Sequence, residues 1–182
     1  MNFSFLLKAT CAFAIVTFTC FFACKKDSFK RKYAEANLNG TKPDTTVQGT
    51  LKFYEQKDGS VKMKLEVLVP KKANQSVAIH LHEHGMCGNA GGDAHGHWNP
   101  TGAQHGKWGS ASFHAGDIGN IQLDATGKGT LLLTTKLWTI GGADSTNIVG
   151  RGVIVHSGVD DYTSQPSGNS GSRIGCGAIE IK

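Results

Sequence analysis

The chain has 182 residues, enough for one ordinary domain with appendages. Only 18% of the residues are charged and four are proline, which excludes a coiled coil and a proline-rich disordered chain. Glycine is frequent, at 24 residues, and scattered Val, Ile, Leu and Thr accompany it, so the composition indicates short strands joined by tight turns. The net charge of +5 arises mainly in the N-terminal segment. From Val47 onward there are 12 basic and 11 acidic residues, and this balance excludes a basic nucleic-acid-binding surface.

Residues 1–23 have the features of an export signal. Lys8 precedes an uncharged run of 15 residues, which is shorter than the roughly 20 residues that a membrane span needs. The run ends at Ala23-Cys24 and polar residues follow, an arrangement that resembles the cleavage motif of bacterial lipoproteins. The resemblance implies acylation of Cys24 and anchoring to a bacterial membrane, in the periplasm or at the cell surface. An ordinary cleaved signal and an uncleaved anchor are the alternatives.

Residues 24–46 are interpreted as a flexible tether, because they mix polar residues, Gly and Pro without apolar periodicity. The folded domain is then expected over residues 47–182. Within it, alternation of apolar and polar residues, or short apolar runs between turn signals, predicts strands and no convincing helix. The predicted strands are 47–54, 61–69, 77–82, 121–124, 129–135, 152–156 and 178–181.

Residues 83–120 form a long stretch without a strand pattern of its own. All eight histidines of the chain lie between positions 80 and 156, and seven of them lie between 80 and 114. Histidine is the commonest metal ligand in proteins. A structureless loop of this length inside a small domain is normally functional or held by a ligand. We therefore expect this stretch to bind metal.

Candidate ligands come from the predicted strands and from the loop. His80 and His82 are two residues apart on a strand, so their imidazoles lie on the same face, and His156 ends another strand. Three imidazoles and a carboxylate make the closed tetrahedral set of a structural zinc site, whereas an all-imidazole set in a flattened geometry suits copper. Spacing alone does not assign each histidine to a metal. The remaining candidates are His95, His97, His105, His114 and Asp117.

Two cysteines lie outside the N-terminal segment, Cys87 in the long loop and Cys176 near the C-terminus. One such pair in an exported protein predicts a disulfide that ties the loop to the last strand. Two free thiols are the alternative.

Six motifs in order, between residues 80 and 177, resemble the copper,zinc superoxide dismutases, and the resemblance extends from about Val47 to the C-terminus. The resemblance implies an all-β fold, a flattened eight-stranded Greek-key barrel or sandwich with long metal-binding and active-site loops. The motifs are HLHEHG at 80–85, Gly92 with HWNP at 97–100, HG at 105–106, HAGDIGN at 114–120, GRGVIVH at 150–156 with DD at 160–161, and GNSGSRIGCG at 168–177.

The resemblance also implies a role for each site residue. His97 would bridge the two metals, and Asp160 would link the free ring nitrogens of one copper ligand and one zinc ligand, His80 and His105. Arg173 would be the cationic group beside the copper, and Cys87 and Cys176 would form the intrasubunit disulfide. The implied copper ligands are His80, His82, His97 and His156. The implied zinc ligands are His97, His105, His114 and Asp117.

The activity that the resemblance implies is the disproportionation of superoxide to dioxygen and hydrogen peroxide. A redox copper would exchange the electrons, zinc would be structural, and Arg173 would offer paired donors to the small anion. The alternatives are a non-enzymatic copper-handling or chaperone domain on the same fold, and a zinc hydrolase, which needs an open zinc position. Superoxide is the expected substrate, and both a monomer and a homodimer are left open.

Two histidines and one loop depart from the family pattern. His84 shares the face parity of His80 and His82, so a further copper ligand is conceivable, but a surface position is the preferred interpretation because four ligands are already assigned. His95 is expected to be solvated. Residues 157–172 contain no Lys or Arg, so the lysines with which longer family members steer superoxide in this loop are missing here.

Overall fold

The computed structural model describes residues 31–182, so the expected export signal and Cys24 lie outside the described residues. The described chain forms an antiparallel sheet with the strand order β5-β4-β7-β8-β1-β2-β3-β6, and a short β9 pairs with β1. The strands are β1 Tyr33–Gly40, β2 Gln48–Glu55, β3 Val61–Leu68, β4 Ser76–His82, β5 Gly119–Gln122, β6 Lys128–Thr135, β7 Gly152–His156, β8 Arg173–Ala178 and β9 Glu180–Ile181. The helical residues described are confined to two short 3-10 helices, η1 Pro70–Lys72 and η2 Asn89–Ala94. The predicted all-β fold, a nearly closed eight-stranded antiparallel barrel, is confirmed.

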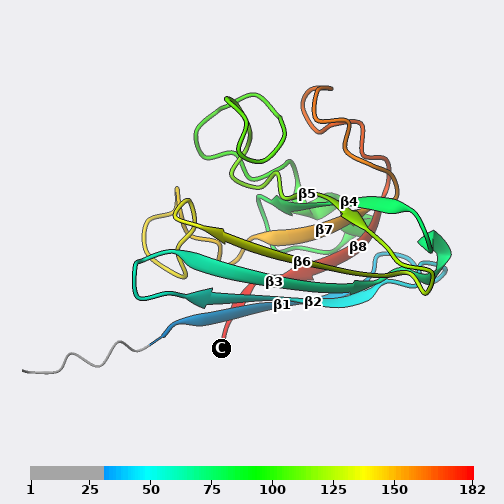
Figure 1. Ribbon diagram of the computed structural model, residues 1–182, viewed down its shortest axis with the longest axis horizontal. Helices are drawn as coiled ribbons and strands as arrows, with labels where there is room; N and C mark the ends of the chain where they lie inside the picture. The colour runs from blue at the N-terminus through cyan, green and yellow to red at the C-terminus, as the bar shows by residue number, and fades with distance from the viewer. Residues whose placement is uncertain (1–30) are drawn as a thin grey trace, which may run out of the picture.

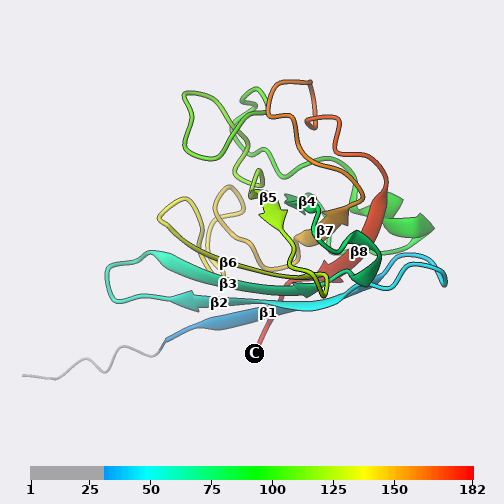
Figure 2. The ribbon, with the colours of Figure 1, turned by 45° about the vertical axis from the view of Figure 1, so that its right-hand side comes forward.

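The barrel is flattened into two layers (Figures 1 and 2). Strands β1, β2, β3 and β6 form one layer, and β5, β4, β7 and β8 form the other. Alternation of side chains decides which face of a strand enters the core, as in β3, where Val61, Met63 and Leu65 are fully buried and the intervening lysines are exposed. Burial of this apolar face is the main source of stability for such a sheet.

The tether predicted over residues 24–46 is wrong for residues 33–40. These residues form β1, which pairs with β2 from Tyr33 to Asn39, with Ala36 opposite Leu51. Ala34, Ala36 and Leu38 point inward and are buried. The folded domain therefore includes Tyr33 onward. The alternation was present in the sequence, but two of the three inward residues are alanines, which have little apolar surface and low strand propensity.

The predicted strand 178–181 covers the short β9 but misses almost all of β8, which runs from Arg173 to Ala178. Gly175 and Gly177 weaken the strand signal of β8 in the sequence, but close packing requires both. A Cβ on Gly177 would lie 2.4 Å from a backbone oxygen of β1, and a Cβ on Gly175 would lie 2.6 Å from the side chain of Val47. Both β8 and β9 pair with β1: β8 pairs with its end, at Asn39 and Gly40, and β9 pairs with its beginning, at Ala34 and Glu35.

Two long loops lie side by side on one side of the barrel in both views, the β4–β5 loop in green and the β7–β8 loop in orange (Figures 1 and 2). The predicted disulfide between Cys87 and Cys176 is confirmed, and it ties the β4–β5 loop to β8. In the chain-entropy picture, a bridge that closes a loop of this size stabilises the fold by roughly 4–5 kcal/mol. Across residues 31–182, no helix has the length and apolar character needed to span a membrane.

Candidate metal centre

Strands β4 and β7 bring three imidazoles together. The strands pair antiparallel, with His80 opposite Ile154. His80 and His82 point to the same face of β4, as their spacing predicts, and His156 follows at the end of β7. The ring centroid of His156 lies 4.9 Å from that of His80 and 5.6 Å from that of His82. All three side chains are buried.

The β4–β5 loop adds a fourth imidazole, that of His97. An isolated bridge pairs His97 with His82, and the next residue, Trp98, donates its backbone N–H to the carbonyl of Leu81 at 2.8 Å. The loop thereby lies along the end of β4, and the His97 ring centroid is 4.0 Å from that of His80. We call His80, His82, His97 and His156 the copper cluster, after the metal that the family resemblance implies for them; one nitrogen from each lies within 4.8 Å of the others.

A second group of four side chains shares His97 with the first. The members are His97, His105, His114 and Asp117, here called the zinc cluster after the metal that the resemblance implies, and they likewise offer one ligand atom each within 4.8 Å of the others. Asp117 lies at its centre: its carboxylate oxygens are 2.8 Å from Nδ1 of His97, 3.0 Å from Nδ1 of His105 and 3.2 Å from Nδ1 of His114. His97 therefore presents Nδ1 to the zinc cluster and Nε2 to the copper cluster.

Six buried ring nitrogens have no hydrogen-bond partner among the described residues, and every one belongs to these two clusters. A buried polar atom left unpaired costs about 1–3 kcal/mol, so six of them in one place indicate ligand atoms. Imidazole nitrogens alone suit copper, and three imidazoles with a carboxylate suit a closed zinc site. The residues present thus fit both metals. The six atoms are Nδ1 of His80, His105 and His114, and Nε2 of His82, His97 and His156.

Asp160 connects the two clusters by a hydrogen bond to one histidine of each. Its carboxylate accepts a hydrogen bond from Nε2–H of His80 at 2.9 Å and another from Nε2–H of His105 at 2.9 Å. The backbone N–H of Tyr162 also donates to this carboxylate, at 2.7 Å, and the Asn120 side chain pairs with the backbone of Asp160. These bonds fix the orientation and tautomer of one ring in each cluster and leave the opposite nitrogen free for a metal.

Backbone carbonyls orient three further rings in the same way. Nδ1–H of His82 donates to the carbonyl of His95 at 2.9 Å, and Nε2–H of His114 donates to that of Ala103 at 3.1 Å. Nδ1–H of His156 donates more weakly, to Gly171 at 3.3 Å. The loops therefore hold these imidazoles in place without help from a metal.

Burial sets the protonation states that metal binding requires. It lowers the pKa of His82 well below its usual value, that of His97 to about 4 and that of His156 to about 3, the last helped by repulsion from His80. Burial alone would raise the pKa of Asp117, but the adjacent His114 and His97 side chains and the backbone N–H groups of His114 and Gly106, which donate to the carboxylate, outweigh burial and lower the pKa. At neutral pH these three rings are neutral and the Asp117 carboxylate is charged.

These shifts predict that the metal-free protein loses stability on mild acidification. His97 and His156 titrate near 6.5 when unfolded, but only at about pH 4 and 3 when folded. Between these values the unfolded chain binds more protons, so stability falls as the pH drops from about 6.5. Calorimetry in the presence of a chelator should show a melting temperature that decreases steadily from pH 7 to pH 4. A constant melting temperature over that range would contradict these shifts.

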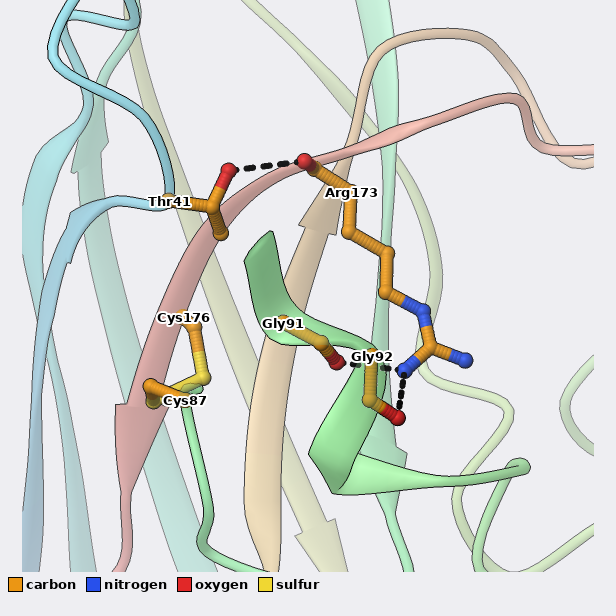
Figure 3. The surroundings of a disulfide bond; sticks show 6 residues. All are labelled: Thr41, Cys87, Gly91, Gly92, Arg173 and Cys176. Carbon is orange, nitrogen blue, oxygen red and sulfur yellow. Dashed lines mark hydrogen bonds between the residues drawn. A yellow bond between two sulfur atoms is a disulfide. The ribbon is translucent and has the colours of Figure 1, made fainter. Parts of the chain in front are cut away.

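Arg173 lies at the start of β8, and its guanidinium reaches the carbonyls of Gly91 and Gly92 in the β4–β5 loop (Figure 3). Its Nη1 donates to the carbonyl of Gly91 at 2.5 Å and to that of Gly92 at 3.3 Å, and Nη2 donates to His95 at 2.5 Å. Thr41 fixes its backbone by donating a hydroxyl hydrogen bond to the carbonyl of Arg173 at 2.8 Å. The guanidinium borders a cavity of about 720 Å³ that three members of the copper cluster also line.

A family model described as copper/zinc superoxide dismutase (SODC) matches residues 47–179. The chain belongs to this family. The Cu-Zn superoxide dismutase of Schizosaccharomyces pombe is 37% identical over 144 residues, which are 76% of this chain and 92% of that protein. Cu-Zn superoxide dismutase 2 of Aquifex aeolicus is 34% identical over 151 residues, 80% of this chain and 85% of that protein.

Solved structures show the same fold for this superoxide dismutase family member. The crystal structure of the clock protein EA4 superimposes with a TM-score of 0.71 at 28% sequence identity. The match covers 82% of this chain and 94% of that one. Because the chain belongs to this family and its two histidine clusters could hold metal ions, copper and zinc are its cofactors.

Two histidines of the chain lie outside both clusters. In addition, two polar residues, Asn120 and Gln165, make contacts that the sequence did not indicate. His84 and His95 are exposed, in line with their interpretation as surface residues. Asn120 pairs with the backbone of Asp160, and the Gln165 side chain pairs with the backbone of His105 at 2.8 and 3.0 Å. These contacts join segments 40 and 60 residues apart, so no local pattern could reveal them.

Removal of the Asp117 carboxylate is expected to release zinc. Asp117→Ala should lower the zinc content below half and lower the melting temperature, because binding energy that favours the folded state is lost. The carboxylate also accepts backbone N–H bonds from His114 and Gly106, so part of the loss arises without metal. Melting each variant with and without zinc separates the two contributions, and Asp117→Asn serves as the milder comparison. Unchanged zinc content in Asp117→Ala would contradict the assignment.

Proposed function

We propose that this chain disproportionates superoxide to dioxygen and hydrogen peroxide, with copper in the copper cluster and zinc in the zinc cluster. One observation carries the proposal: two complete ligand sets, both buried, share a single imidazole, His97. A shared imidazole with one nitrogen in each set is what a bridged two-metal site requires. Membership of the copper/zinc superoxide dismutase family supports the same activity.

Copper, when bound, supplies one-electron exchange, so that one superoxide is oxidised to dioxygen and a second is reduced to hydrogen peroxide with two protons. The protein's part is to admit the anion, position it and deliver protons. Nε2 of His97 faces the copper cluster and can hold and release a proton there. Asp160 keeps the ring of His80 in one orientation throughout.

Arg173 recruits the anion. Three of the five guanidinium N–H directions are accounted for by carbonyls of the β4–β5 loop, which hold the group at the edge of the cavity. Among the described residues that line this cavity, Arg173 is the only Lys or Arg. It therefore supplies the permanent positive charge that draws superoxide toward the copper cluster.

The experiment that tests the proposal separates an enzyme from a copper-handling domain. The purified protein is analysed for copper and zinc while the decay of superoxide is followed by stopped flow. We expect one ion of each metal in the two clusters and decay far faster than the spontaneous rate. A protein that holds copper but leaves the spontaneous rate unchanged would be a copper-handling domain instead.

We further propose that the protein is exported and anchored to a bacterial membrane by acylation of Cys24. The support is the sequence motif Ala23-Cys24 after an uncharged apolar run, together with the oxidised Cys87–Cys176 pair, which suits an exported protein. Such an anchor places the domain in the periplasm or at the cell surface.

The anchor predicts where the protein fractionates. Wild-type protein should sediment with membranes, because more than one acyl chain gives stable attachment at about 0.8 kcal/mol per buried CH₂. Cys24→Ala should remain unprocessed or become soluble. Mass spectrometry of the mature N-terminus provides the direct readout, and an unmodified Cys24 in the mature protein would contradict the proposal.

A further inference from the structure

A third group of metal-ligating side chains, Glu83, His84 and His95, lies beside the copper cluster and has no part in the proposed reaction. One ligand atom from each of the three lies within 4.8 Å of the others. The rings of His84 and His95 have centroids 4.7 Å apart and are nearly perpendicular, at 81°. Oε2 of Glu83 is 3.8 Å from Nδ1 of His95. We call these three side chains the rim site.

The backbone brings the rim site together without a metal. Immediately after β4 the chain pairs with the returning part of the β4–β5 loop: Glu83 N–H donates to the carbonyl of Gly96 at 3.1 Å, and His84 N–H donates to that of Ala94 at 3.2 Å. These two bonds bracket His95. The isolated bridge between His82 and His97 continues this pairing into the copper cluster.

His95 is held in an unusual conformation. Its φ is +60°, a region that residues other than glycine rarely adopt. Its carbonyl accepts hydrogen bonds from both His82 Nδ1 and Arg173 Nη2. These contacts fix the backbone from which the imidazole projects, so the position of this candidate ligand is determined before any metal arrives.

The donor set and its exposure define the metal. Two imidazoles and one carboxylate are ligands for borderline divalent ions, and among these Cu²⁺ binds a given nitrogen–oxygen site most tightly. The His95 side chain is 59% exposed and that of Glu83 is 45% exposed, so water can complete the coordination and the ion can exchange. We propose that the rim site binds one Cu²⁺ ion in addition to the two metals of the buried clusters.

The location suggests a use for this ion. Glu83 and His95 line the same cavity as His82, His97 and His156 of the copper cluster. An ion released from the rim site thus enters the space that leads to the buried copper ligands. The rim site is therefore a loading site for copper, a role that rests on the proposed assignment of the copper cluster.

Copper binding to protein already loaded with copper and zinc tests the site itself. The loaded protein is dialysed against micromolar Cu²⁺ and analysed for bound metal, and the added copper is characterised by electron paramagnetic resonance. We expect wild type to take up one further ion whose spectrum shows imidazole nitrogen. The double variant His84→Ala/His95→Asn should bind it more than about tenfold more weakly. Asparagine is chosen because it removes the imidazole and keeps a polar side chain at residue 95.

Glu83→Gln and Glu66→Gln form a matched pair, since each removes one carboxylate and only the first belongs to the rim site. Glu66 is an exposed residue of β3 that pairs with Lys64. Glu83→Gln should weaken binding of the further Cu²⁺ ion, and Glu66→Gln should leave that binding unchanged. Equal binding by wild type and the double variant, or no further ion in wild type, would overturn the inference. A failure of the buried clusters would instead lower the metal content of all variants equally.

The loading role has its own readout. Zinc-loaded, copper-free protein is mixed with limiting Cu²⁺, and the filling of the copper cluster is followed by its visible absorption. The double variant should fill several-fold more slowly than wild type and reach the same end point. Equal filling rates would overturn the loading role and leave only a surface site.

Discussion

His156→Ala is expected to lose copper and with it the consumption of superoxide, while zinc remains bound. His156 belongs to the copper cluster alone, and its Nε2 is buried without a hydrogen-bond partner. Loss of a residue that only hydrogen-bonds to a metal ligand typically lowers metal affinity about 10–100-fold. Removal of a ligand itself should therefore weaken copper binding by more than about 100-fold.

The zinc content of the same variant serves as its control. The zinc cluster does not include His156, so retained zinc shows that the loops have kept their structure. Metal analysis after dialysis and superoxide decay are measured on one sample. Near-normal turnover in His156→Ala would refute the copper assignment, and a joint loss of both metals would show that the two clusters are not separable.

Arg173→Ala is expected to keep both metals and to lower kcat/KM by about 10–100-fold, the scale of electrostatic steering. The hydrogen bonds of the guanidinium among the described residues go to loop carbonyls and not to side chains of either cluster. The β7–β8 loop, where lysines could have shared the task, has no cation between residues 157 and 172. Arg173 should therefore contribute an unusually large part of the local attraction.

Salt dependence distinguishes steering from a structural defect. In wild type the rate should fall as ionic strength rises, because salt screens the attraction between the anion and Arg173. In Arg173→Ala the dependence should be flatter or inverted. Lys64→Ala is the control, since it removes one charge from β3, outside the cavity, and should keep the wild-type rate and slope. Full activity with the wild-type slope in Arg173→Ala would show that another group guides the anion.

Most of the barrel could be predicted because its strands carry local signals. In β3 the alternation of Val61, Met63 and Leu65 with charged residues needs no knowledge of partners. The strand β1 was missed because Ala34 and Ala36 contribute a weak apolar signal, although the residues alternate correctly. The start of β8 was missed because its glycines are selected by close packing against neighbouring strands, a feature invisible in one sequence.

The metal centre could be predicted only in part from the sequence. The same-face placement of His80 and His82 follows from strand geometry alone, whereas the division of ligands between two metals came from the resemblance to a family. The links made by Asp160, at 2.9 Å to a ring of each cluster, depend on two loops meeting. The contacts of Asn120 and Gln165 depend on the same meeting, so they could be recognised only in the folded chain.

The central claim is that copper in the copper cluster consumes superoxide, and a copper titration of zinc-loaded protein tests it most directly. Superoxide decay is measured at each step, together with the copper content. We predict no catalysis with zinc alone and a rate that rises in proportion to copper until the copper cluster is full. Catalysis by copper-free protein, or full copper occupancy without catalysis, would contradict the claim.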